Sequence, residues 1–239
     1  MAIYISAQSG EGGDSFTIPA TCTKLVVVVG NHQWGSIGQM DSGAENMTLI
    51  DEQIGDYDET AAMWYLDNPT TGARVIEDTG NGNDQMVIAI YLKDTATGAP
   101  HTKFKDANGG SDLDLPLTPT LDNCYLIAGL STEPPPTVYS GQAELGNVQL
   151  DSYINLMAGG YQQTTAALYG MGFDLDYGGR SQGVSAAFAP SAAATGTNMS
   201  INIGDSWKDV NSAKINISDS WKAVDAIKIN VGDTWKDVF

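Results

Sequence analysis

Apolar residues along the chain fall in short runs that have the length of β-strands, and clusters of Gly, Asn, Asp, Pro and Thr separate the runs. Some runs, such as Val26–Val29, are apolar at every position, which is typical of strands that are buried on both faces. Helical signals are nearly absent. We therefore predict strands at residues 24–30, 46–54, 61–67, 73–79, 85–93, 124–131, 147–158, 166–175 and 183–189.

The spacing of these runs predicts an all-β fold. About nine short strands without crossover helices favour two antiparallel sheets packed face to face, a jelly-roll-like β-sandwich. Pro and Gly residues predict turns at 68–72, 80–84 and 105–112. A short helix at residues 161–169 is an alternative to a strand there, and the Gly-rich stretch at residues 9–15 is predicted to be a flexible lead-in to the first strand.

The last part of the chain repeats one short unit three times. Trp207, Trp221 and Trp235 occupy the same place in each unit, with a spacing of 14 residues. A small, polar stretch with the composition of a linker precedes the units. We predict a β-sandwich body at residues 1–190, a linker at 191–199 and three tandem 14-residue β-hairpin repeats at 200–239.

Each unit has the pattern of a β-hairpin, in which an Ile-Asn-Ile or Ile-Asn-Val strand leads to a turn and then to Trp-Lys. A three-residue loop would pair Ile203 with Trp207, whereas a two-residue loop would offset them, and the sequence leaves both open. A lone hairpin is marginal in water, and a domain of fewer than about 40 residues usually needs disulfides, a metal or oligomerisation. The repeats contain no Cys and no His.

We therefore predict that other copies of the chain cover the repeats, in a homo-oligomer for which a trimer is one form. Docking on the chain's own sandwich, or a flexible tail that binds a sugar or another partner, are the alternatives. The candidate assembly residues are Trp207, Trp221, Trp235, Ile203, Ile217 and Val231.

The net charge of −18 argues against nucleic acid as a partner, because phosphate binding needs clustered Lys and Arg. An anionic membrane surface is disfavoured for the same reason. Membrane insertion is not expected, since no run approaches the roughly 20 apolar residues of a membrane helix. The first residues lack a basic segment followed by a long apolar one, so we expect no secretory signal peptide.

Catalytic patterns are weak. The two histidines, His32 and His101, stand in loop-like surroundings, and no G-x-S-x-G turn is present. Asp174 and Asp176 would share one strand face, but nothing in the sequence fixes a partner for them. We predict that the protein is not an enzyme and that it has no cofactor.

Two further groups of residues favour ordinary structural roles. Asp106, Asn108, Asp112 and Asp114 surround two glycines and could bind calcium, but an Asx-rich turn is the preferred interpretation and no metal site is predicted. Cys22 and Cys124 are interpreted as small apolar residues on or near strands, with a single bridge between them as the alternative.

Several sequence pieces resemble a β-sandwich module of structural proteins from tailed viruses, which also occurs in some bacterial surface proteins. The matching pieces keep the order of that module: Leu25–Val29, Met47–Ile50, Trp64–Leu66 with Asn68, Pro69 and Gly72, then Ala73–Ile76, residues 125–131, 140–146 and 184–190. The segment "QMVIAIYLKD" and the acidic loops depart from it. The terminal units are similar to short GxxWKxV repeats of viral tail-associated proteins.

This resemblance implies a virion structural protein, part of a phage-like tail fibre, spike or capsid decoration. It would be made in the host cytoplasm, bind other virion proteins and take part in host attachment, with a host-surface glycan as one further partner. The alternative function is that of a carbohydrate-binding module of a cell-surface or secreted protein. Its candidate sugar-stacking residues are Trp34, Trp64, Tyr139 and Tyr161.

Overall fold

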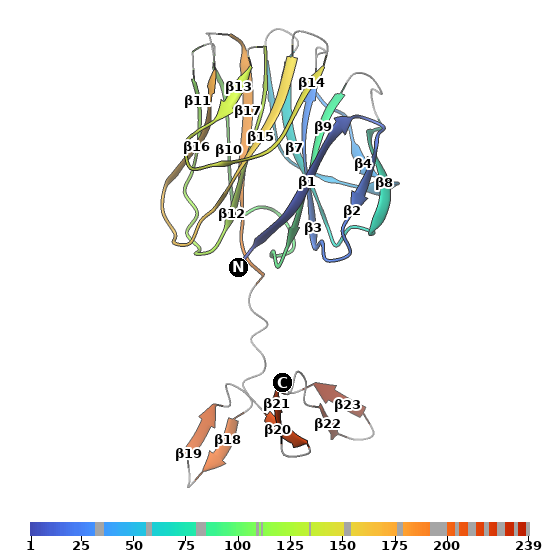
Figure 1. The fold of residues 1–239 in the computed structure, drawn as a ribbon, viewed down its shortest axis with the longest axis vertical. Coiled ribbons are helices and arrows are strands. Elements are labelled where there is room, and N and C mark those ends of the chain that lie inside the picture. The colour runs from blue at the N-terminus through green and yellow to red at the C-terminus, as the bar shows by residue number, and fades with distance from the viewer. Residues whose placement is uncertain are drawn as a thin grey trace. The chain divides into compact units, whose positions relative to one another are not determined.

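A computed structural model gives the fold (Figure 1). It describes residues 1–31, 36–55, 59–79, 85–108, 110, 112–133, 135–150, 154–175, 179–191, 200–203, 206–209, 214–217, 220–223, 228–231 and 234–237. The chain divides into two compact units, Met1–Ser191 and Ala192–Phe239. The described residues include no helix, so none of them forms a helix that could span a bilayer.

The first half of the larger unit is built from two sheets. Their strands are β1 (Ile3–Glu11), β2 (Ser15–Ile18), β3 (Lys24–Asn31), β4 (Met40–Ser42), β5 (Glu45–Asn46), β6 (Thr48–Ile54), β7 (Thr60–Asp67), β8 (Gly72–Asp78) and β9 (Gln85–Lys93). One sheet has the order β1-β9-β3-β7-β6, and the other has the order β2-β8-β4-β5. The first strand lies beside the last and the second beside the last but one, which is the connection of a jelly roll.

The second half repeats this plan. Its strands are β10 (Thr102–Asn108), β11 (Asp112–Leu117), β12 (Tyr125–Thr132), β13 (Pro136–Val138), β14 (Ala143–Leu150), β15 (Ile154–Gln162), β16 (Tyr169–Leu175) and β17 (Ser181–Phe188). The sheet orders are β10-β17-β12-β15-β14 and β11-β16-β13. Each strand therefore has a counterpart in the first half, with β5 continuing into β6 as the one addition.

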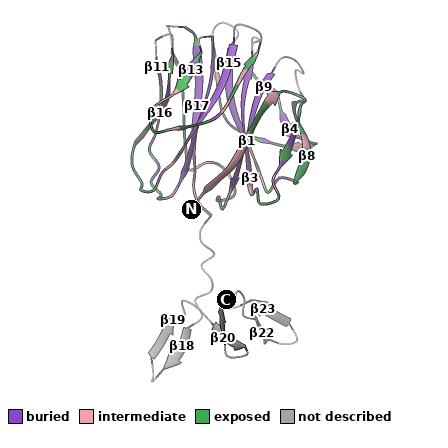
Figure 2. Cartoon of the chain, viewed as in Figure 1, coloured by how far each residue is buried: buried purple, intermediate pink, exposed green. Residues whose placement is uncertain are grey.

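The four sheets stack as four layers with three apolar cores between them (Figure 1). The central core lies between the two five-stranded sheets, where Val26 and Ile88 pack with Ile127 and Val184. Each outer core lies between one five-stranded sheet and its own smaller sheet. The strands that are apolar on both faces lie at the centre of the two inner layers, and Figure 2 shows them as the most buried part of the body. All-apolar runs arise here because both faces of an inner sheet are covered.

The two halves agree in register as well as in strand order. In β6 the pairing with β7 shifts between Leu49 and Asp51, so that Ile50 is an extra, bulged residue. In β14 the pairing with β15 shifts between Glu144 and Gly146, which makes Leu145 the bulged residue at the corresponding position. Ile50 and Leu145 are both buried in the central core. Bulges placed alike in both halves indicate one repeated structural unit.

The two jelly rolls pack on each other about a pseudo-two-fold axis. Strand β1 contacts β14, and its counterpart β10 contacts β6, so each contact has a reciprocal one. The axis passes near the equivalent residues Val28 of β3 and Gly129 of β12, which face each other. A Cβ on Gly129 would lie 2.2 Å from Cγ1 of Val28. Glycine is therefore required at residue 129 by the close approach of the two sheets.

The prediction of an all-β antiparallel fold is confirmed, and the sandwich has four sheets where the sequence suggested two. The segment 147–158 was expected to be one strand, but it contains the end of β14 and the start of β15. The Gly-rich stretch at residues 9–15 connects β1 to β2 and does not lead into a first strand. The alternative helix at residues 161–169 is not formed, since these described residues hold the end of β15, a turn and the start of β16.

The predicted turns have different outcomes. The turn at 68–72 connects β7 to β8, with positive φ at Asn68 and Gly72. The turn at 80–84 lies outside the described residues. The predicted turn at 105–112 is shorter than expected, because β10 continues to Asn108 and β11 begins at Asp112.

In the smaller unit, β18 (Ser200–Ile203), β19 (Ser206–Asp209), β20 (Lys214–Ile217), β21 (Ser220–Ala223), β22 (Lys228–Val231) and β23 (Thr234–Asp237) pair as three two-stranded ribbons. In the first ribbon Asn202 lies opposite Trp207, and Ile203 lies opposite Ser206. This is the offset pairing of a two-residue connection, and the other two ribbons have the same register.

Candidate functional site

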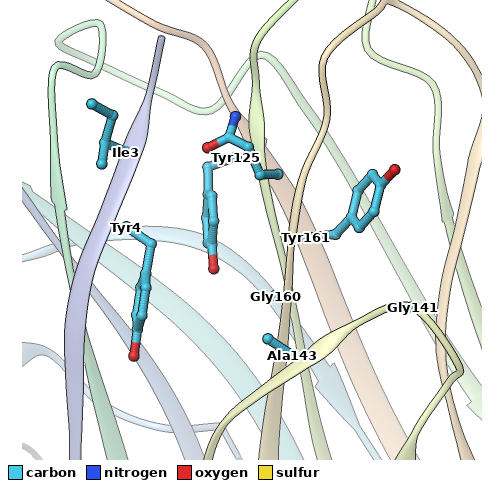
Figure 3. Close-up of a pocket in the computed structure, with 8 residues that line it drawn as sticks. Ile3, Tyr4, Tyr125, Gly141, Ala143, Gly160 and Tyr161 are labelled. Atoms are coloured by element: carbon cyan, nitrogen blue, oxygen red, sulfur yellow. The ribbon is translucent and has the colours of Figure 1, made fainter.

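A shallow pocket lies where the first strand of the body meets the second jelly roll (Figure 3). Its volume is about 420 Å³. The lining residues are Ile3, Tyr4, Tyr125, Gly141, Ala143, Gly160, Tyr161 and Gln162, and none of them carries a charged side chain. The pocket is therefore neutral, although the net charge of the chain is −18.

Aromatic side chains and a glycine shape the pocket. The rings of Tyr4 and Tyr125 stack at 5.7 Å between centroids and lie side by side in Figure 3. A Cβ on Gly160 would lie 2.6 Å from the hydroxyl of Tyr125, so only glycine lets this tyrosine lie against β15. Tyr161 stands on the other side of β15 in the figure and stacks on Tyr169, with 3.8 Å between the ring centroids.

Three polar groups line the pocket. Burial and the neighbouring Tyr4 raise the pKa of Tyr125, so its hydroxyl stays protonated and can donate a hydrogen bond. The Tyr4 hydroxyl accepts from the backbone of Ala7, and burial raises the pKa of Tyr4 as well. The side-chain amide of Gln162 donates to the carbonyl oxygens of Cys124 (3.1 Å) and Gln163 (3.4 Å). The amide oxygen of Gln162 is then the atom left to accept from a ligand.

In the first jelly roll, side chains fill the position that is equivalent to the pocket. The registers make Lys24 equivalent to Tyr125 and Tyr65 equivalent to Gly160. Lys24 is 1% exposed, its ammonium lies 4.5 Å from the ring centroid of Tyr65, and it donates to Asp67 and to the carbonyl of Gly98 (2.9 Å). Burial lowers the pKa of Lys24, and the bond to Asp67 opposes that shift.

A pair of acids, Glu59 buried and Glu133 exposed, lies at the opposite end of the strands, between the two jelly rolls. Glu59 precedes β7, is 2% exposed, and hydrogen-bonds Glu133, which follows β12. Burial, and secondly the charge of Glu133, raise the pKa of Glu59 to about 7. Arg180 lies 3.6 Å from Glu133 and partly offsets this repulsion. The other carboxyl oxygen of Glu59 has no hydrogen-bond partner among the described residues.

The two outer edges where the jelly rolls meet are closed in different ways. At one edge Lys103 and Lys105 of β10 contact Asp51 of β6 at 3.2 and 3.0 Å. The same lysines donate to backbone carbonyl oxygens of β6, at Ile50 (2.6 Å) and Glu52 (2.8 Å), and so satisfy that edge strand. At the other edge the equivalent of Asp51 is Gly146. A Cβ there would lie 2.5 Å from Oγ of Ser9.

Of the four predicted sugar-stacking residues only Tyr161 is among the lining residues, and its ring lies on the other side of β15, where it packs against the outer core of the second jelly roll. Trp64 is buried in the outer core of the first jelly roll, which removes it as a stacking surface. The Tyr139 hydroxyl donates to Asp114 at 2.9 Å. Trp34 lies outside the described residues.

The other predicted chemical groups do not converge. Asp106 is on β10, whereas Asp112 and Asp114 are on β11 of another sheet. Asp174 is on β16, opposite Asp112. Among the described residues no group of three or more His, Cys, Asp or Glu side chains is placed to hold a metal ion.

The remaining candidate residues that the structure describes are one histidine and two cysteines. The ring nitrogen Nε2 of His101 accepts from the backbone N–H of Thr120 at 3.0 Å. Cys22 and Cys124 are both buried and unpaired. His32, Asp176 and the side chain of Asn108 lie outside the described part of the chain.

The predicted assembly residues lie on the ribbons. Trp207, Trp221 and Trp235 are each opposite an Asn, and Ile203, Ile217 and Val231 are each opposite a Ser or Thr. Their side chains lie outside the described part, so a core shared by the three ribbons stays a prediction.

The fold and the site define a class: a tandem jelly-roll protein with a neutral tyrosine pocket and an appended segment of repeated β-ribbons. No family model matches the chain, and neither a curated protein nor a solved structure matches it. The resemblance to tailed-virus modules stays a prediction.

Sequence reasoning missed the pocket because β1 was not predicted. Tyr4 lies in the short apolar run "IYI", which has the composition of a strand but is brief and is followed by small and polar residues. The similarity of the two jelly rolls is hardly visible in the sequence. It can be recognised only in the apolar strands "KLVVVVGN" and "YLIAGLST", which are equivalent in the structure.

Proposed function

We propose that the protein is a structural component of a virus particle, as part of a fibre, spike or surface decoration of a tailed virus. The body would serve as a rigid block, and the terminal ribbons would join copies of the chain or join it to other virion proteins. The resemblance of the body and of the repeats to viral structural modules provides the link to a particle. Jelly rolls serve in viral capsids but also in lectins and other proteins, so the fold alone does not decide the function.

One observation carries the assembly role: the ribbon is repeated three times, and each strand pairs only within its own unit in the described backbone. A two-stranded ribbon is marginal in water and gains stability when another surface covers one face. Each unit supplies one Trp, a residue that can bury on the order of 200 Å². Repetition multiplies such a weak contact, as in repeat proteins whose neighbours complete each other's core.

The distribution of charge favours the same segment for self-association. Residues 200–239 contain five Lys and six Asp, a net charge of −1, whereas residues 1–199 carry −17. Bodies of that charge repel each other at moderate ionic strength. The ribbons are the part of the chain on which this repulsion acts least.

The mass of the protein in solution tests the assembly role. The full chain is expected to be a homo-oligomer by light scattering, and a chain that ends at Ser191 is expected to be a monomer. A matched full-length variant with Trp207, Trp221 and Trp235 all changed to Ser keeps the length and charge and should also be monomeric. A monomeric full chain, or an oligomer that survives the truncation, would contradict this role.

The particle assignment needs its own test. Antibodies against the body should label purified virus particles from the source of the gene, and the protein should sediment with them. If the protein oligomerises but is absent from such particles, the assembly role stands and the viral role fails.

A further inference from the structure

We propose that the tyrosine pocket between β1 and the second jelly roll binds a neutral saccharide. The proposal concerns the larger unit alone, and it holds whether or not the ribbons assemble into a particle. It assigns the carbohydrate-binding alternative to a pocket whose stacked rings, Tyr4 and Tyr125, are not among the four residues that the sequence suggested.

The two jelly rolls have the same plan but differ at the position of the pocket. They share strand order, register and a bulge, so a hollow required by the fold would occur in both. In the first jelly roll the buried side chain of Lys24 lies over Tyr65 and fills the place. In the second, Tyr125 and Gly160 stand at these positions and a pocket of about 420 Å³ remains. The opening therefore results from particular residues and not from the architecture.

The residues that line the pocket are uncharged and mostly apolar. Ligand pockets are usually about 300–1,000 Å³, mostly apolar, with a few polar groups that orient the ligand. This pocket has that volume, and the rings of Tyr4 and Tyr125, together with Ile3 and Ala143, supply its apolar surface. A charged ligand would find no opposite charge among the lining residues. A sugar ring has apolar C–H faces and neutral hydroxyls, which suits tyrosine side chains that combine an apolar ring with a hydroxyl.

The pocket offers a ligand both a hydrogen-bond donor and a hydrogen-bond acceptor. The protonated hydroxyl of Tyr125 is a donor, and the amide oxygen of Gln162 is an acceptor because its two N–H groups already bond carbonyls. Gly141 contributes backbone with a φ of +91°, at the turn that precedes β14. A hydroxyl-rich ligand can use both a donor and an acceptor, whereas a hydrocarbon would leave them unsatisfied.

The experiment uses the full chain on an array of neutral mono- and oligosaccharides, followed by titration of the best hit. Ala143→Tyr is the blocking variant, because Ala143 is exposed on β14 and lies opposite Gly160. We expect it to abolish binding. Thr48→Tyr is the matched control: Thr48 is the equivalent exposed residue of β6, opposite Tyr65, and its substitution should leave binding unchanged.

Tyr125→Phe gives a second readout that keeps the packing of the ring. Loss of one hydrogen bond should weaken binding about tenfold while the melting temperature stays the same. The proposal is overturned if no neutral saccharide binds. It is equally overturned if the hits are only charged glycans, or if binding survives Ala143→Tyr.

Discussion

The acid pair between the two jelly rolls makes the stability of the body depend on pH near neutrality. The folded protein holds the pKa of Glu59 at about 7, whereas the ordinary value is 4.5. Between these values the folded state binds more protons than the unfolded state, so the free energy of unfolding falls as the pH rises. The contribution of Glu59 is fully present below pH 4.5 and is lost as the pH passes through 7.

The size of this loss follows from the two pKa values. One pKa unit corresponds to about 1.4 kcal/mol, so the loss is on the order of 3 kcal/mol between pH 4.5 and pH 8. Glu59→Gln removes the titration and keeps an amide N–H that can donate to Glu133, as the protonated acid does. We expect this variant to match the original protein at pH 5 and to be more stable by about 3 kcal/mol at pH 8.

Urea unfolding followed by tryptophan fluorescence, at steps from pH 4.5 to 8.5, measures the effect. Other groups also titrate in this range, since burial raises the pKa of Glu52, so the difference between variant and original isolates Glu59. Glu133→Gln is the control: it removes the second cause of the shift and leaves burial, so the pH dependence should shrink without vanishing. If Glu59→Gln shows the same pH dependence as the original protein, the pair does not share a proton and the reasoning is wrong.

Two further changes test the packing of the body, both by urea unfolding. Gly129→Ala places a methyl group 2.2 Å from Cγ1 of Val28. We expect it to lower the free energy of unfolding by about 1–3 kcal/mol. The double variant with Val28→Ala should recover part of that loss, and strict additivity of the two single costs would count against direct contact at the axis. Asp67→Asn leaves the buried ammonium of Lys24 without its ion-pair partner and should lower the free energy of unfolding by about 3 kcal/mol. Lys24→Met removes the charge and keeps the apolar stem, so it should lower the free energy of unfolding by less. Equal costs for these two variants would show that the ion pair matters less than packing.

The sequence predicts the central strands of the inner sheets well, for a physical reason. Residues 24–30 and 85–93 are apolar on both faces because each inner sheet is covered twice, and such runs stand out clearly from their surroundings. The strands β1, β2, β4, β10, β11 and β13 were missed. Lys103 and Lys105 interrupt β10 at an edge, and β11 alternates Asp with Leu in "DLDLPL", which resembles an acidic turn.

The site could not be predicted because it depends on the packing of one half of the body against the other. Tyr4 and Tyr125 are 121 positions apart in the sequence, and only the fold of two jelly rolls stacks their rings. Glu59 and Glu133 are likewise distant, and the raised pKa of Glu59 comes from burial that only the assembled layers provide. Tyr161, which the sequence suggested for sugar stacking, lies near the end of β15 with its ring packed on Tyr169, and that orientation depends on the fold as well.

The duplication also limits where the protein can meet other molecules. An isolated jelly roll would expose the apolar face of its five-stranded sheet, and a second copy could cover that face in a symmetric dimer. Here the chain covers the face itself, because the central core joins its own two halves. The outer faces of the small sheets are polar at alternate positions, as the exposed residues of β2 and β11 show. The central apolar faces of the two jelly rolls are therefore covered within one chain, and the assembly that we propose is expected to use the repeated ribbons instead.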